Sequence, residues 1–178
     1  MSDSPDDFDE FFRTDLPQLI RFLVRSGWGW EDARDAAAEA MLSAYQGWIE
    51  IDHPRAYVRK AACRVAAQQR RRDHERLQRS IRGGMTTPEH DDPYAMFDAR
   101  MDATRRLVAL LKLLPDKQRT VLVWHLDGFG NSEIACHLNM SPATVASHLR
   151  HAKQSVRRLL SSPERLPTEM IYEGGAPS

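Results

Sequence analysis

The chain has 178 residues, with 25 basic and 25 acidic side chains and a formal net charge of zero. This length allows one ordinary domain or two small ones. No run of 18 apolar residues is present and the N-terminus is acidic where a signal peptide would be basic, so we expect a cytoplasmic protein without membrane insertion.

The zero net charge conceals a segregation of sign along the chain. Residues 1–52 carry 4 basic and 12 acidic side chains, which leaves −8, whereas residues 53–82 carry 10 basic and 2 acidic side chains, which leaves +8. An acidic stretch and a second basic stretch follow, over residues 83–102 and 103–160. Two basic blocks with an acidic spacer between them indicate two surfaces for a polyanion.

The first half of the chain has a helical pattern. Apolar residues at spacings of three and four predict a helix over residues 8–26 and an alanine-striped helix over residues 31–45, with acidic residues in its early turns. Residues 46–53 break the pattern. Pro54 suits a first helical position and opens a long helix to about Arg79, with one apolar and one basic side.

The second half resumes the helical pattern after a break. Residues 82–97 combine glycine, proline and acidic residues, which predicts a flexible acidic linker. Helices are expected from about residue 98 to 114 and from Pro115 to about Gly128, and residues 161–178 are expected to be a disordered tail. Strand alternation is absent. The sequence therefore predicts an all-α protein with helical domains at residues 1–81 and 98–160.

Residues 129–158 have the pattern of a helix-turn-helix. Asn131 or Ser132 suits the cap of a short first helix, and Asn139 tolerates the left-handed conformation of the turn. Ser141 suits the cap of the second helix, with Pro142 at its first position.

The outer face of that second helix carries side chains suited to base edges in a major groove. These are Thr144, Ser147, His148 and His151. Arg150, Lys153 and two further arginines follow, where phosphate contacts would hold the helix in register. The alternative is an ordinary helical hairpin with a polar face, but the caps and the basic residues favour DNA binding.

Catalytic interpretations find no support in the motifs. There is no glycine-rich phosphate loop and no G-x-S-x-G elbow. His148 and His151 share a helix face without a third metal ligand, and Cys63 and Cys136 are far apart. We therefore expect no enzyme activity, no metal and no cofactor.

Two parts of the chain resemble one family. The stretch LLKLLPDKQRTVLVWHLDGFGNSEIACHLNMSPATVASHLRHAKQSVRRLL resembles region four of sigma-70-type RNA polymerase sigma factors. EDARDAAAEAMLSAYQGW and HPRAYVRKAACRVAAQQRRR are similar to two helices of region two. The resemblance covers roughly residues 8–80 and 98–160, without a region one or a globular region three, as in the extracytoplasmic-function (ECF) subfamily.

The resemblance implies a factor that binds core RNA polymerase, recognises the minus-ten and minus-thirty-five promoter elements and directs transcription initiation. It implies polymerase contacts at Asp32, Asp35, Glu39, Met41 and Leu42. Minus-ten contacts would come from Trp48, Ile51, His53, Arg55, Arg59, Lys60, Cys63 and Arg64. Minus-thirty-five contacts would come from Ser141, Thr144, Ser147, His148, Arg150, His151 and Lys153. Such factors are often held inactive by an anti-sigma factor, which is a further partner to expect.

A second hypothesis is an ordinary DNA-binding regulator that binds an operator as a dimer. In that case the N-terminal half would be a helical sensor or dimerisation domain. The discriminating feature is residues 31–72. Their acidic-start helix, aromatic loop and basic helix are explained by the sigma factor hypothesis and are accidental in the regulator hypothesis.

Overall fold

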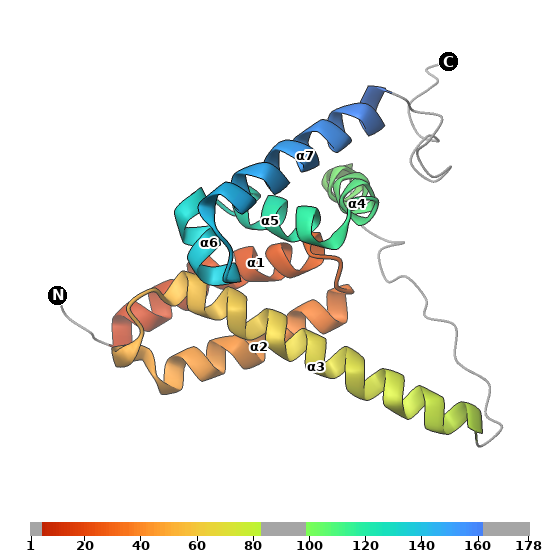
Figure 1. The fold of residues 1–178 in the computed structure, drawn as a ribbon. Helices are drawn as coiled ribbons and strands as arrows, with labels where there is room; N and C mark the ends of the chain where they lie inside the picture. Colours follow the sequence, from red (N-terminus) through yellow and green to blue (C-terminus); the bar gives the residue numbers. More distant parts are fainter. Residues whose placement is uncertain (1–4, 83–98, 162–178) are drawn as a thin grey trace, which may run out of the picture. The chain divides into compact units, whose positions relative to one another are not determined.

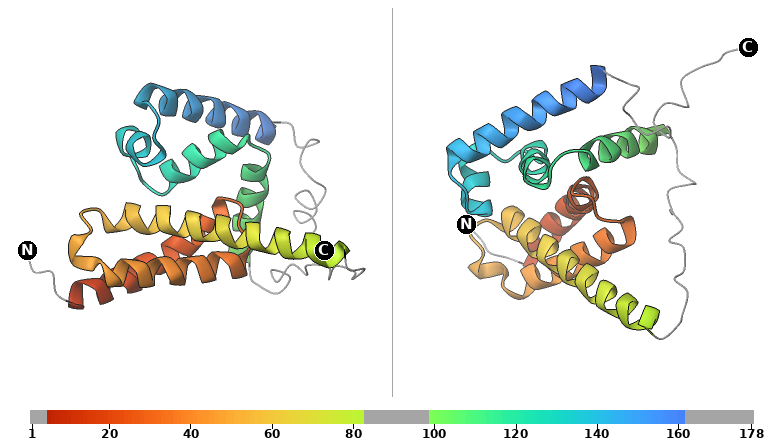
Figure 2. Two further views of the ribbon diagram at one scale, coloured as in Figure 1. Left: turned by 60° about the horizontal axis from the view of Figure 1, so that its bottom comes forward. Right: turned by 45° about the vertical axis from the view of Figure 1, so that its right-hand side comes forward.

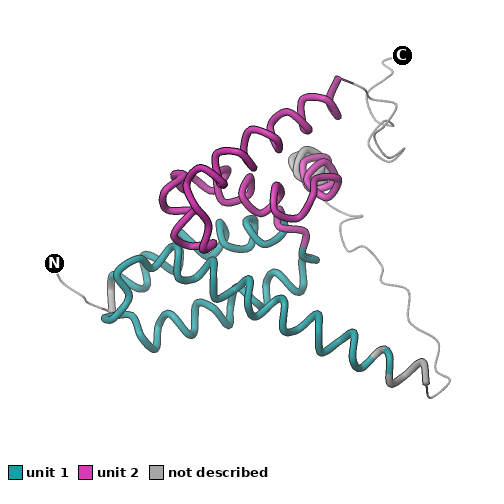
Figure 3. Tube along the Cα trace, in the orientation of Figure 1, with its two compact units in different colours: residues 1–24, 28–96 teal, residues 25–27, 97–178 magenta. Residues whose placement is uncertain are grey.

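The computed structural model describes residues 5–82 and 99–161, and within these ranges it is helical without any strand. The predicted all-α fold class is confirmed. The chain divides into two compact units, residues 1–24 with 28–96 and residues 25–27 with 97–178 (Figure 3). The predicted linker and tail lie outside the described residues, except for Arg82 and Ser161, which end helices.

The first unit contains three α-helices and a short 3₁₀ turn. These are α1 (Pro5–Arg25), α2 (Trp30–Gln46), η1 (Trp48–Glu50) and α3 (Pro54–Arg82). Helices α2 and α3 pack against each other (Figure 1). Five alanines of α2 are completely buried, and Ala56, Ala62 and Ala66 of α3 are also buried. Because these side chains are small, the two helix backbones can approach closely.

The C-terminal turns of α3 extend beyond the core of this unit (Figures 1 and 2). The guanidinium of Arg70 lies 4.0 Å from the centre of the Trp28 ring and ties α3 to the α1–α2 loop. Residues 71–76 after it are all exposed. Within them, Arg71 pairs with Glu75 at 3.8 Å and Arg76 with Asp73 at 3.5 Å, so local ion pairs support this charged arm.

The second unit contains four helices. These are α4 (Ala99–Lys112), α5 (Asp116–Leu126), α6 (Asn131–Leu138) and α7 (Pro142–Ser161). Helix α5 packs against α6 and α7 (Figure 2), and four consecutive residues from Val121 to Trp124 are buried. The Trp124 ring lies 4.9 Å from the ring of Phe129, which fixes the start of the loop to α6. No helix in the described ranges is long and apolar enough to cross a bilayer.

Candidate nucleic-acid interfaces

Helices α6 and α7 form the predicted helix-turn-helix. Asn139 has φ 54° and ψ 51°, so the predicted left-handed turn residue is confirmed. The hydroxyl of Ser141 accepts a hydrogen bond from the backbone N–H of Thr144 at 3.1 Å, which confirms the predicted cap of α7. Asparagine is tolerated at this corner because its short polar side chain lowers the cost of a left-handed conformation.

The predicted cap of the first helix is wrong. Helix α6 begins at Asn131, so neither Asn131 nor Ser132 is its N-cap, and Gly130 takes that position. The carboxylate of Glu133 accepts a hydrogen bond from the backbone N–H of Gly130 at 2.7 Å. The acidic residue three positions after the cap therefore stabilises this end of the helix, as in one half of a capping box.

Removing the cap of α7 should destabilise the second unit. In Ser141→Ala the N–H of Thr144 loses its acceptor, and we expect the free energy of unfolding to fall by about 1 kcal/mol. Ser161→Ala is the control, because that hydroxyl only bonds the carbonyl of Arg158 at the exposed end of α7. Urea denaturation followed by circular dichroism measures both variants, and equal midpoints would contradict the role of the cap.

The buried residues of α7 and its predicted DNA-contacting residues lie on different faces of the helix. Val145, Leu149 and Ala152 are buried against the rest of the unit. Among the predicted minus-thirty-five residues, the exposed ones are Ser141, Thr144, Arg150, His151 and Lys153, and the half-buried ones are Ser147 and His148. The hydroxyls of Ser141 and Thr144 lie 2.8 Å apart, so the cap also occupies two side chains that were predicted to contact DNA.

A groove runs along one flank of α7. It is lined by His125 of α5, Asn131 of α6, and Ala146, Leu149, Arg150, Lys153, Gln154 and Arg157 of α7. Lys153 Nζ lies 3.2 Å from His125 Nε2, which joins α5 to α7. Three cationic side chains along one groove suit a chain of phosphates. The sequence did not predict His125 and Asn131 as part of this surface, because three helices must pack before they meet.

The solvent-facing side of α3 begins with exposed side chains. His53, Arg55, Lys60 and Arg64 are all exposed. Lys60 and Arg64 are one helical turn apart and therefore share a face. The exposed Arg71 lies seven residues further on, so the basic surface continues into the charged arm.

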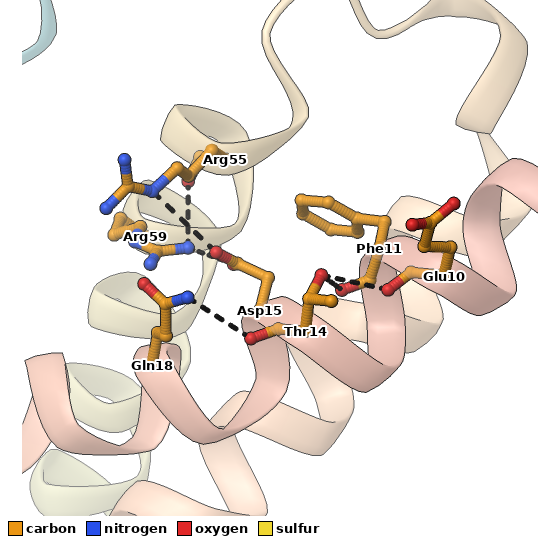
Figure 4. A network of polar contacts seen from close by, with 7 residues as sticks. All are labelled: Glu10, Phe11, Thr14, Asp15, Gln18, Arg55 and Arg59. Carbon is orange, nitrogen blue, oxygen red and sulfur yellow. Dashed lines mark hydrogen bonds and ion pairs between the residues drawn. The ribbon is translucent and has the colours of Figure 1, made fainter.

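Arg59 corrects the predicted basic side of α3. Its side chain is completely buried, and Nη1 donates a hydrogen bond to the carboxylate of Asp15 in α1 (Figure 4). A side chain enclosed in this way presents no surface to a nucleic acid. In this structure Arg59 therefore joins two helices and does not lie on the exposed basic face.

The loop before α3 divides its apolar residues between core and surface. Trp48 is half-buried, and its ring lies 5.1 Å from both Phe8 and Phe11 of α1, which assigns it to an aromatic cluster. Ile51 is half-buried as well. Ile49 is 75 % exposed and is the apolar side chain of this loop that solvent reaches most.

Cys63 lies half-buried on α3, and burial raises the pKa of its thiol from 9.0 to about 11. Cys136 on α6 is exposed. Because the thiolate is the reactive form, a raised pKa leaves less of it at any pH below 11. At about pH 8, iodoacetamide should therefore label Cys136 well before Cys63. Peptide mass spectrometry measures both rates, and similar rates would contradict the burial of Cys63.

The predicted polymerase-binding residues of α2 fall on two sides of the helix. Asp35, Glu39 and Leu42 are exposed, and Leu42 shows 57 % of its surface. Asp32 is half-buried. Met41 is a correction, because it is 1 % exposed and belongs to the core with the alanine stripe.

Comparisons with known proteins agree on one family. The family described as "Sigma-70, region 4" matches residues 104–156, within the second unit. The chain is 30% identical over 164 residues to the RNA polymerase sigma-E factor of Streptomyces avermitilis, covering 88% of this chain and 86% of that protein. It is also 30% identical over 165 residues to the RNA polymerase sigma-E factor of Streptomyces coelicolor, covering 86% of each.

The fold matches a solved structure over most of its length. A chain in the co-crystal structure of the sigma factor RpoE with the anti-sigma factor NepR from Bartonella quintana aligns with a TM-score of 0.65. The alignment covers 87% of this chain and 97% of that one, at 19% identity. The helix-turn-helix of the second unit, together with the match of residues 104–156 to region 4, places the chain among DNA-binding proteins of transcription. The chain belongs to the sigma-70 family of RNA polymerase sigma factors, in its ECF subfamily, and acts in transcription initiation.

Proposed function

We propose that the chain binds core RNA polymerase through the outer face of α2, binds the minus-ten element through α3, and binds the minus-thirty-five element through α7. The observation that carries this proposal is the surface of the first unit. It presents an acidic and apolar face on α2, at Asp35, Glu39 and Leu42, and a basic face on α3, at Lys60 and Arg64. An operator-binding regulator would need only the helix-turn-helix of the second unit.

The minus-ten proposal combines cations with an apolar loop. Arg55, Lys60 and Arg64 would contact phosphates, and Ile49 would contact a base that has left the stack. The other proposed contacts are His53, Ile51 and the accessible parts of Trp48 and Cys63. Binding to the separated strands would lower the free energy of the melted promoter and so favour melting. The protein would therefore act by binding alone, without covalent chemistry.

In the minus-thirty-five proposal, one surface of α7 contacts bases and another contacts phosphates. Thr144, Ser147, His148 and His151 would contact base edges, while the groove with Arg150 and Lys153 would hold the phosphate backbone. We propose an anti-sigma factor as a third partner, since the structurally similar RpoE is bound to NepR in its co-crystal. The chain itself would act in the cytoplasm, together with the polymerase and the promoter.

Gel filtration with purified core RNA polymerase tests the proposal. We expect this chain to co-elute with the polymerase. A regulator would instead elute separately and bind palindromic DNA without the polymerase. Elution as two separate species at micromolar concentration would contradict the proposal.

Leu42→Asp should weaken polymerase binding without unfolding the protein. Leu42 is 57 % exposed on the proposed contact face, and an apolar contact there would be replaced by a desolvated charge. We expect an affinity loss of about tenfold or more. Leu160→Asp is the matched control, because that leucine is 59 % exposed in the last turns of α7. Equal affinities of the two variants, measured by fluorescence anisotropy, would contradict the α2 contact.

A further inference from the structure

A single carboxylate of α1 faces two arginines of α3. The side chain of Asp15 is 6 % exposed, that of Arg59 is 0 % exposed and that of Arg55 is 44 % exposed. Arg55 and Arg59 are one helical turn apart and therefore share a face of α3. Asp15 lies 44 residues before Arg59 in the chain, so this cluster is a tertiary contact between the two helices.

The two arginines use Asp15 in different ways. Arg59 Nη1 donates to Asp15 Oδ2 and also to the carbonyl oxygen of Arg55 at 3.4 Å, so its guanidinium lies wholly inside the unit. Its Cζ lies 5.9 Å from the centre of the Phe22 ring. Arg55 directs its Nε towards Asp15 Oδ1 at 3.7 Å, while its two terminal nitrogens point away from Asp15 (Figure 4).

Neighbouring polar side chains of α1 do not share this role. Thr14 bonds the carbonyls of Glu10 and Phe11, and Gln18 bonds the carbonyl of Thr14, all within α1 (Figure 4). Among the residues drawn there, Asp15 is the one that reaches α3. A guanidinium–carboxylate contact is directional, whereas an apolar contact between alanine side chains is not, so the Asp15–Arg59 contact is suited to fixing the rotation of α3.

We propose that Asp15 and Arg59 are a positioning pair that fixes the rotation of α3, so that Lys60 and Arg64 face the promoter together. This inference rests on the proposed function. Lys60 follows Arg59 directly, and consecutive residues of an α-helix are about 100° apart around the helix axis. The rotation that points Arg59 into the core therefore also determines where Lys60 points. Asp15 also aims Arg55, because it holds the Nε end and leaves the terminal nitrogens directed outward.

The test separates positioning from stability. A buried ion pair replaced on both sides by apolar residues often retains its stability, whereas removal of one partner does not. We therefore compare wild type, the double variant Asp15→Leu/Arg59→Met, and Arg59→Lys, which keeps the charge but loses the planar fork. Thermal denaturation, core-polymerase affinity and the rate of promoter opening, followed by permanganate reactivity, are measured for each variant.

Both variants are expected to bind core polymerase like wild type and to open the promoter on the order of tenfold more slowly. Arg55→Ala should slow opening in wild type but have little further effect in the double variant, since Asp15 no longer aims Arg55. If either variant folds and opens the promoter at the wild-type rate, the inference is overturned and the pair only stabilises the fold. If wild type itself opens no promoter, the proposed function fails first.

Discussion

Replacing Arg59 with methionine is expected to lower the free energy of unfolding of the first unit by about 3–5 kcal/mol. The reason is Asp15, which is 5 % exposed as a whole residue and would be left in the core without its buried cationic partner. Arg55 cannot compensate fully, because its Nε lies 3.7 Å from Asp15 Oδ1 and its side chain is 44 % exposed. Small domains are marginally stable, so a loss of this size is a large part of the total.

Arg55→Ala is the matched control for this loss. It removes the more exposed of the two ion pairs with Asp15, and pairs of that kind contribute about 0–1 kcal/mol. Hydrogen exchange resolved by peptide separates the units, since only amides of α1, α2 and α3 should lose protection in Arg59→Met. Equal protection in the two variants would show that the Asp15–Arg59 contact contributes little.

Replacing both Arg150 and Lys153 with alanine is expected to weaken binding to minus-thirty-five duplex DNA and to make it less dependent on salt. Both side chains line the groove on α7 and are exposed. Each phosphate contact releases condensed counterions, which contributes about 0.9 to the slope of log affinity against log salt concentration. The slope should therefore shrink by about 1.8, and the affinity difference from wild type should be largest at low salt.

The matched control for this variant replaces Lys112 and Lys117, two exposed cations of the second unit that do not line the groove. It removes the same net charge, so any difference between the double variants reports position and not total charge. Fluorescence anisotropy between about 50 and 200 mM salt gives both slopes. Identical slopes for the two double variants would mean that the groove is not the phosphate-binding surface.

Local signals in the sequence were sufficient for the helices and for most of the turn. The alanine spacing of α2, Pro54 at the first position of α3, and the Asn139 and Ser141 pair each determine structure through neighbours within a few residues. The cap of α6 was also a local signal, since Glu133 follows Gly130 by three positions. Capping preference alone favours Asn131 or Ser132, because their side chains are better capping groups than glycine.

The differences between the expected and the observed positions of the site residues share a non-local cause. In the sequence Arg59 and Lys60 are adjacent cations, and only packing against α1 buries one and exposes the other. Met41 and Leu42 differ in the same way, because one step around a helix separates the core from solvent. The ring contacts of Trp48 depend on Phe8 and Phe11, which lie about forty residues earlier. Side-chain type could not predict these positions.

Transcription with purified core RNA polymerase is the measurement that tests the central claim most directly. A template library with random sequence at the minus-ten and minus-thirty-five positions is transcribed with and without this protein, and the transcripts are sequenced. The account predicts that polymerase starts at defined positions only when the protein is present, and that the enriched templates share two separated sequence elements. The same start sites with and without the protein, or enrichment of one palindromic element, would contradict it.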